Sequence, residues 1–298
     1  MLAVGRLGLY YWSEAKKADI LFRLTLALSL VADWLLFIGA AAAGSTIIVS
    51  TTTDNIATDG YCSLREAIVA ANTDSAFNEC TAGSGNDTIT IDPTLSTPTI
   101  FTLTLTGSGE DRAMTGDLDV IGSATNTLTT TGAGLENAII DGNGTDRVVD
   151  IQPGALATIS GVTIRNGNPG ASNDGGGIAL HLTASLTLNN SLVFTNTAAS
   201  GRGVHVLGGL TLDASIVEAN YGGGVHNDGG FLTFKNTQIV SNTNGYGVTD
   251  EVLGGLEFDG GTVSGNQGGG ILNDNAIATL TNLNIIDNTG GGGEQNKA

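Results

Sequence analysis

Two histidines, His205 and His226, have a spacing that could place them in one site. Each follows a valine at the same offset in a repeated segment. Equivalent residues of neighbouring β-coils lie about 5 Å apart, so the two rings could share a metal ion. Structural zinc takes four ligands, and no third His or Cys recurs at this offset. We therefore interpret the pair as a surface ladder, with the third histidine, His181, standing alone.

The segment 83–89 resembles one copy of a glycine-rich calcium-binding nonapeptide. It reads Gly-Ser-Gly-Asn-Asp-Thr-Ile, and Asp87 would supply the carboxylate. Such sites need stacked copies, because the oxygen ligands of one Ca²⁺ come from adjacent turns. The sequence has a single copy. Asp87 is thus a candidate calcium ligand, the alternative is a plain turn into a strand over 88–91, and no other cofactor is expected.

Carboxylates suited to polysaccharide cleavage are not evident in the sequence. A glycosidase needs two of them about 5 to 9.5 Å apart, and Asp228 and Asp274 occupy equivalent positions but two coils apart. The motifs of polygalacturonase-like enzymes and pectate lyases are absent, and 5% aromatic residues are too few for sugar-stacking platforms. We expect no catalytic residues. A polysaccharide lyase or glycoside hydrolase with an unfamiliar site is the alternative.

The two cysteines of the chain, Cys62 and Cys80, are predicted to pair in an oxidising compartment. Closing a loop of about 18 residues would stabilise the fold by roughly 3 kcal/mol in the chain-entropy model. Two buried free thiols are the alternative. No neighbouring His or Lys would lower a thiol pKa, so neither cysteine is expected to be reactive.

Residues 1–43 have the three parts of a secretory signal. Two lysines precede an apolar run that begins at Ile20 and ends in small residues before Gly44. Asp33 lies inside this run, where burial in lipid would cost about 3 kcal/mol. An uncleaved N-terminal membrane anchor is therefore the alternative to cleavage. Either reading predicts an extracellular or cell-surface protein.

The formal net charge of −18 limits the partners of the chain. Four of the eleven basic residues fall within the first 23 positions, so the remainder is more acidic still. Such a surface repels phosphate backbones and anionic lipid, and we expect no nucleic-acid partner. A solvated surface that keeps an exported protein dispersed explains the acidity.

Five copies of one pattern occupy residues 186–288. Four read Leu-x-Leu or Leu-x-Phe and the fifth Ala-x-Leu, each followed by a β-branched residue and then Asn, at successive spacings of 24, 22, 24 and 22. The copies begin at Leu186, Leu210, Leu232, Leu256 and Ala278, and end at Asn196, Asn220, Asn242, Asn266 and Asn288. No repeat contains a segment long enough for a helix. This predicts an all-β fold, a right-handed parallel β-helix with about 22 to 24 residues per coil, over a leucine-rich repeat.

The recurring asparagines are predicted to be structural rather than ligand-binding. Asn enters the left-handed backbone region at low cost, which suits a tight corner. Its amide could also bond the Asn of the next coil. We therefore expect Asn196, Asn220, Asn242, Asn266 and Asn288 to form a ladder.

The repeats set the predicted domain boundaries. Looser copies at 116–121, 138–143 and 157–167 extend the solenoid over residues 88–298, after a capping segment at 44–87. Within that segment, Ser63 and Glu66 form a capping box that predicts a helix over 63–72. After Asn288 no aliphatic residue follows the glycines. We therefore expect an uncapped last coil, prone to self-association or continued by a missing C-terminal region.

The stretch 62–68, Cys-Ser-Leu-Arg-Glu-Ala-Ile, with Ala-Ala-Asn at 70–72, resembles the signature of CSLREA-domain proteins. These are bacterial exported proteins with right-handed parallel β-helix repeats. Matching segments at 116–119, 140–142 and 161–167 extend the resemblance over most of residues 46–288. The resemblance implies a location and an architecture without an agreed activity. We expect a non-catalytic secreted or cell-surface scaffold, adhesive or binding a surface polysaccharide or a protein.

Overall fold

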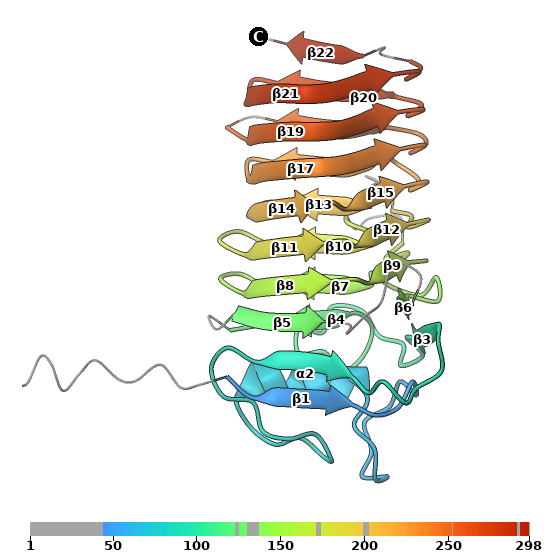
Figure 1. Cartoon of the computed structure of the whole chain (residues 1–298), viewed down its shortest axis with the longest axis vertical. Coiled ribbons are helices and arrows are strands. Elements are labelled where there is room, and N and C mark those ends of the chain that lie inside the picture. The colour runs from blue at the N-terminus through green and yellow to red at the C-terminus, as the bar shows by residue number, and fades with distance from the viewer. Residues whose placement is uncertain are drawn as a thin grey trace, which may run out of the picture. The chain divides into compact units, whose positions relative to one another are not determined.

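The computed structural model describes residues 44–122, 125–129, 137–170, 174–198, 203–251, 253–290 and 293–297. The predicted signal or anchor segment, 1–43, lies outside them. Over the described residues the chain winds into stacked coils, each strand pairing in parallel with its counterpart in the next coil (Figure 1). This confirms the predicted parallel β-helix.

The strands form two sheets. The fourteen-stranded sheet contains β1 (Thr46–Val49), β2 (Thr88–Ile91), β3 (Thr99–Thr102), β5 (Thr125–Thr129), β6 (Ala138–Asp141), β8 (Leu156–Ser160), β9 (Thr163–Arg165), β11 (Ser185–Asn189), β12 (Leu192–Phe194), β14 (Gly209–Asp213), β15 (Ile216–Glu218), β17 (Phe231–Val240), β19 (Gly255–Ser264) and β21 (Ile277–Ile286). The eight-stranded sheet contains β4 (Leu118–Val120), β7 (Val149–Ile151), β10 (Ile178–Leu180), β13 (Val204–Val206), β16 (Val225–Asp228), β18 (Tyr246–Glu251), β20 (Gly269–Asp274) and β22 (Glu294–Lys297).

The core consists of aliphatic ladders in the predicted register. Leu186 pairs with Leu210, which pairs with Leu232, and all three are buried. On the eight-stranded sheet, Val204 pairs with Val225 in the same way. Stacking like residues at the strand spacing removes each ladder from water, and this burial supplies the main stabilisation of a solenoid.

The solenoid begins earlier than the predicted residue 88. Strand β1 pairs with β2 in parallel, from Thr46 opposite Thr88 to Val49 opposite Ile91. Its alternation places Ile47 and Val49 inside, fully buried. One short strand without a second copy of the repeat carries no periodic signal, so this part of the first coil was not recognisable in the sequence.

The asparagine ladder forms as predicted, but the reason for the choice of Asn differs. The left-handed residue of each corner is the one before the Asn: Thr195, Ala219, Ser241, Gly265 and Asp287. The Asn side chains point inward instead. The amide of Asn220 donates to Asn242 Oδ1 and to the carbonyl of Val193, and its own Oδ1 accepts from Asn196. The corner needs a buried side chain that donates and accepts at once.

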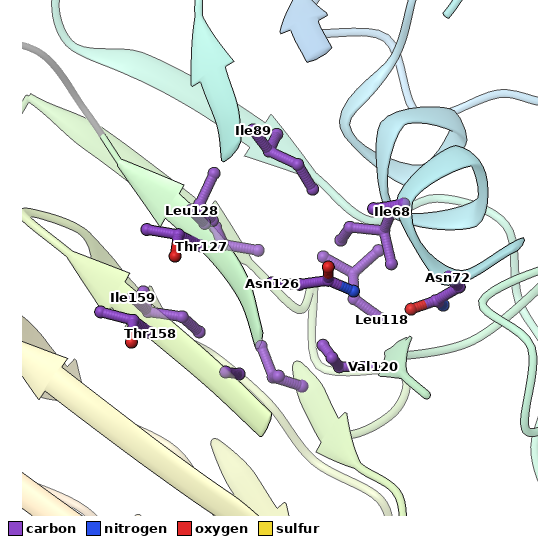
Figure 2. Close-up of a pocket in the computed structure, with 14 residues that line it drawn as sticks. Ile68, Asn72, Ile89, Leu118, Val120, Asn126, Thr127, Leu128, Thr158 and Ile159 are labelled. Carbon is purple, nitrogen blue, oxygen red and sulfur yellow. The ribbon is translucent and has the colours of Figure 1, made fainter. Parts of the chain in front are cut away.

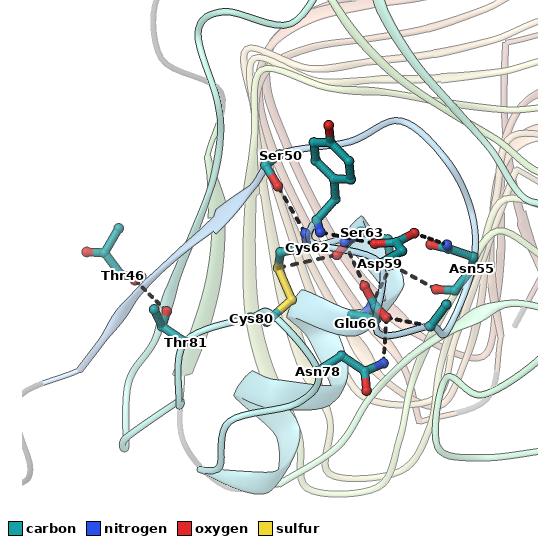
Figure 3. Close-up of a disulfide and its surroundings, with 12 residues drawn as sticks. Thr46, Ser50, Asn55, Asp59, Cys62, Ser63, Glu66, Asn78, Cys80 and Thr81 are labelled. Atoms are coloured by element: carbon teal, nitrogen blue, oxygen red, sulfur yellow. Dashed lines mark hydrogen bonds between the residues drawn. A yellow bond between two sulfur atoms is a disulfide. The ribbon is translucent and has the colours of Figure 1, made fainter.

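The predicted cap is present at the N-terminal end (Figure 3). Helix α2 (Leu64–Thr73) starts at Ser63, whose hydroxyl accepts from the backbone N–H of Glu66, while Glu66 Oε2 accepts from the backbone N–H of Ser63 at 2.9 Å. Cys62 and Cys80 form the predicted disulfide, with Cα atoms 4.9 Å apart. Residues 64–71 are buried throughout. The helix therefore closes the first coil with its whole surface rather than with one face.

A small cavity of about 30 Å³ lies between α2 and the first coils. Figure 2 shows Ile68 and Asn72 reaching toward it from the helix, opposite Leu128 and Ile159 from the strands. Most of its lining is aliphatic. Its volume has room for solvent but not for an organic ligand, so we assign it no function.

The last coil is more complete than the sequence predicts. Strand β22 pairs with β20, with Glu294 in register with the buried Ile271. The missing aliphatic residue thus does not prevent the chain from rejoining the sheet. Leu280 and Leu283 of β21 remain only partly buried. Within the described residues, no helix is both long enough and apolar enough to cross a membrane.

Candidate functional site

The outward face of the eight-stranded sheet carries histidines and a series of carboxylates. Its middle row places Asp119 opposite Asp150 and His205 opposite His226. Two residues further along each coil, Asp228 pairs with Glu251, which pairs with Asp274. Because strand residues alternate between faces, the aliphatic neighbours of these groups point into the core.

Three carboxylates meet at the N-terminal end of this face. Asp117, Asp119 and Asp150 each place one oxygen within 4.8 Å of the other two, and all three residues are buried, at 6%, 0% and 4% exposure. Arg147 contacts two of them, donating to Asp150 Oδ2 at 2.5 Å and to Asp117 Oδ2 at 3.1 Å. Gln152 donates to Asp119 and Asp150, both at 3.2 Å. We call Asp117, Asp119 and Asp150 the acidic cluster.

Burial sets the protonation of two of these groups. It raises the pKa of Asp117 to about 8, with the negative charge of Asp119 adding to the rise and Arg147 opposing it. Burial likewise raises the pKa of Asp119 to about 7, against hydrogen bonds from the Ala113 amide and Gln152. Removing an anion from water favours its protonated form, and crowding with like charges adds to that preference.

The helix cap positions the acidic cluster through Arg65. This side chain is 1% exposed, and all five of its N–H groups are used. It forms a two-point ion pair with Asp54, and it donates to the carbonyls of Ala113, Gly116 and Asp117 at 2.8 to 3.1 Å. The same segment is fixed to the sheet by the Ala113 N–H, which donates to Asp119 Oδ2 at 2.7 Å.

Gly116 is required where the segment turns into β4. Its φ is +66°, and a Cβ here would lie 2.6 Å from Asp146 Oδ2 and 2.5 Å from the Gly107 carbonyl. Any other residue would displace the segment that holds Asp117. Glycine accepts both the left-handed backbone and the close contact.

The histidines lie on the same face, and one is more buried than predicted. His205 and His226 pair in register with ring centroids 5.5 Å apart, which confirms their stacking. His226 is 8% exposed, so it is not a surface residue; its Nε2 lies 3.3 Å from Glu251. His181 is not alone, because its Nε2 lies 2.9 Å from Asp150 Oδ1. Neighbouring coils cover the histidine rings more closely than the spacing of the histidines in the sequence predicts.

Asp87 has a structural part in the first turn. Its Oδ1 accepts the backbone N–H groups of Ser45 and Ser84, both at 2.8 Å, and the residue is fully buried. Calcium binding at Asp87 stays a prediction. The group of three carboxylates close enough to share an ion, among the described residues, lies instead at the acidic cluster.

Asp228 and Asp274 sit two coils apart as predicted, and Glu251 lies between them. The acidic cluster was missed because its coils are irregular: 31 residue numbers separate Asp119 from its partner Asp150, whereas later coils repeat every 22 to 24. The available signal was the alternation of Asp119 and Asp150 with aliphatic neighbours, Leu-Asp-Val and Val-Asp-Ile.

Comparison with known family models, curated proteins and solved structures finds no match to this chain. The chemistry of the face therefore has to be argued from its geometry. Asp119 is fully buried beneath the segment that Arg65 holds, so it has no contact with solvent. Further along the face, Asp228 is exposed and Glu251 and Asp274 are half-buried, so these groups are open to a ligand.

Proposed function

We propose that this chain is an exported, non-catalytic β-helix scaffold of the CSLREA-domain type that binds a glycan along the outward face of its eight-stranded sheet. One observation carries the proposal: five successive coils each place an exposed or half-buried polar group on this face, namely His181, His205, Asp228, Glu251 and Asp274. The signal-like segment 1–43 and the resemblance of residues 62–72 support export.

Regular spacing favours an extended ligand. From β16 to β20 a carboxylate recurs in every coil, one strand spacing from the last, and stacked repeats form long surfaces suited to polymers. Carboxylate and imidazole groups exchange hydrogen bonds with hydroxyls. The charge of −18 repels anionic polymers, so the ligand class is a neutral or amine-bearing glycan.

A glycan-cleaving enzyme is the second candidate, and one observation favours it. Asp119 is held toward its neutral form by burial, while Asp150 is paired with Arg147 in the next coil. Glycosidic cleavage uses a protonated carboxyl group beside a second carboxyl group. Burial counts against it, because substrate would have to displace the segment 113–117 to reach Asp119.

Binding and product release on a glycan panel separate the two candidates. We expect the purified protein to retain neutral or amine-bearing glycans and to release neither reducing ends nor unsaturated sugars. Acidic polysaccharides belong in the panel, since the enzyme candidate would act on them. Product release that is lost in Asp119→Asn would replace the scaffold proposal with the enzyme.

A further inference from the structure

The acidic cluster carries more negative charge than its neighbours balance. Three carboxylates face one guanidinium, that of Arg147, and one imidazole, that of His181, which leaves at least one surplus negative charge when all three carboxylates are ionised. Unbalanced charges in a buried site cost several kcal/mol each, at roughly the scale of buried ion desolvation. Asp146, also buried, adds a further acidic group nearby. A divalent cation would supply the missing charge.

The spacing of the oxygens suits calcium. Ca²⁺ binds oxygen ligands at about 2.3 to 2.6 Å, so two ligands of one ion lie no more than about 5 Å apart. The three carboxylates offer atoms within 4.8 Å of one another. They come from β4, from β7 and from the residue preceding β4, so the fold brings them together from two coils.

A second, independent observation comes from buried polar atoms without hydrogen-bond partners. One such atom belongs to the cluster itself: Asp150 Oδ1, on a residue that is 4% exposed. Asp150 Oδ1 and His181 Nε2 lie 2.9 Å apart without a hydrogen bond between them. Such atoms in a native site call for an ion or ordered solvent.

We infer that Asp117, Asp119 and Asp150 bind one divalent cation, with Ca²⁺ the best match to three carboxylate oxygens. The ion fastens the segment 107–117 to the sheet, because Asp117 ends that segment and Asp119 holds its Ala113 N–H. Arg65 fixes the same segment from the other side. The inference does not depend on glycan binding.

Calorimetric titration of the chelator-treated full chain with CaCl₂ tests the site. We expect one ion per chain, with a dissociation constant of roughly 10⁻⁵ to 10⁻³ M. Asp119→Asn and Asp150→Asn should each weaken binding at least about tenfold, since each removes a charged ligand. Asp250→Asn is the matched control: this aspartate is fully buried in the same sheet, several coils away, and its substitution should leave binding unchanged.

Trypsin digestion of the wild-type protein tests the calcium site without requiring that any variant folds. Arg112 is exposed in the segment that the ion fastens, so Ca²⁺ should slow cleavage after Arg112 in the wild type several-fold. Asp119 is fully buried, so Asp119→Asn can fail to fold; Asp117→Asn then replaces it in the calcium titration. Absence of calcium binding by the wild type, or equal binding by wild type and the Asp150→Asn variant, would overturn the inference.

Discussion

Arg65 shows how one side chain links the cap of the solenoid to its candidate site. Four residues of the Ser-Leu-Arg-Glu segment have separate tasks: Ser63 and Glu66 cap the helix, Leu64 fills the core, and Arg65 holds the carbonyls of 113–117. The capping box explains Ser63 and Glu66, and the apolar pattern of the helix explains Leu64. The fourth depends on a contact across about fifty residues, which local sequence reasoning does not reach.

Replacing Arg65 should destabilise the N-terminal end. Arg65→Met leaves Asp54 as a buried anion without its partner and three carbonyls without donors, and we expect a loss of about 3 to 5 kcal/mol. Chemical denaturation followed by circular dichroism measures it. Arg112→Met removes an exposed arginine and is the control; equal stability of the two variants would show that the Arg65 network contributes little.

Asn242 should be costly to replace for the reason the structure gives. Asn242→Val removes hydrogen bonds to Asn220, to Asn266 and to the carbonyl of Val217 inside the coil, with an expected loss of about 2 to 4 kcal/mol. Asn284→Val, at an exposed strand position, should shift the melting temperature by at most about 2 °C. A stable Asn242→Val variant would mean that the ladder is dispensable.

The raised pKa values of Asp117 and Asp119 predict that the stability of the chelator-treated, calcium-free protein depends on pH. The folded state keeps Asp117 protonated up to about pH 8 and Asp119 up to about pH 7, above the ordinary 3.8. It therefore binds protons more tightly than the unfolded state, and the stability this gives is lost as pH rises toward 8. Asp117→Asn should flatten the decline between about pH 5 and 8.5. A decline equally steep in both proteins would contradict the assignment.

At the scale of elements, the disulfide and the helix act as one cap. Cys62 directly precedes the capping box, and Cys80 closes a loop of 18 residues around α2. Replacing both cysteines with alanine should cost about 3 kcal/mol. Hydrogen exchange should show the loss first in α2 and β1, while β14 to β19 keep their protection. Uniform loss across all coils would mean that the cap and the distant coils unfold together.

The predictability of each element follows from how regular its coil is. Residues 186–288 repeat at 22 to 24 residues, so their ladders, corners and register could be predicted from the sequence. Coils before residue 157 carry long insertions between strands, and the same inner aliphatic residues recur without a fixed period. The acidic cluster lies among these irregular coils. Its pairing depends on which insertion folds over which strand, and the sequence pattern does not encode that directly.

At the scale of the whole described solenoid, one sheet differs from the other in chemistry. The eight-stranded sheet presents histidines and carboxylates outward, with the acidic cluster at one end and the Asp228, Glu251 and Asp274 row at the other. On the fourteen-stranded sheet the outward residues of the regular coils include Thr187, Thr211 and Thr233, together with scattered charges such as Asp213 and Glu257. Ligand recognition is therefore expected on the face that carries the histidines and the carboxylate row.

Affinity for a neutral or amine-bearing glycan, measured for matched variants of the two faces, shows whether the outward face of the eight-stranded sheet binds the ligand. Asp228→Asn with Glu251→Gln removes two charges from the proposed face, while Asp213→Asn with Glu257→Gln removes two exposed charges from the other sheet. We expect at least about tenfold weaker binding for the Asp228→Asn, Glu251→Gln variant and a change within about twofold for the Asp213→Asn, Glu257→Gln variant. Equal affinities for the two double variants, or no glycan bound by the wild type, would contradict this expectation.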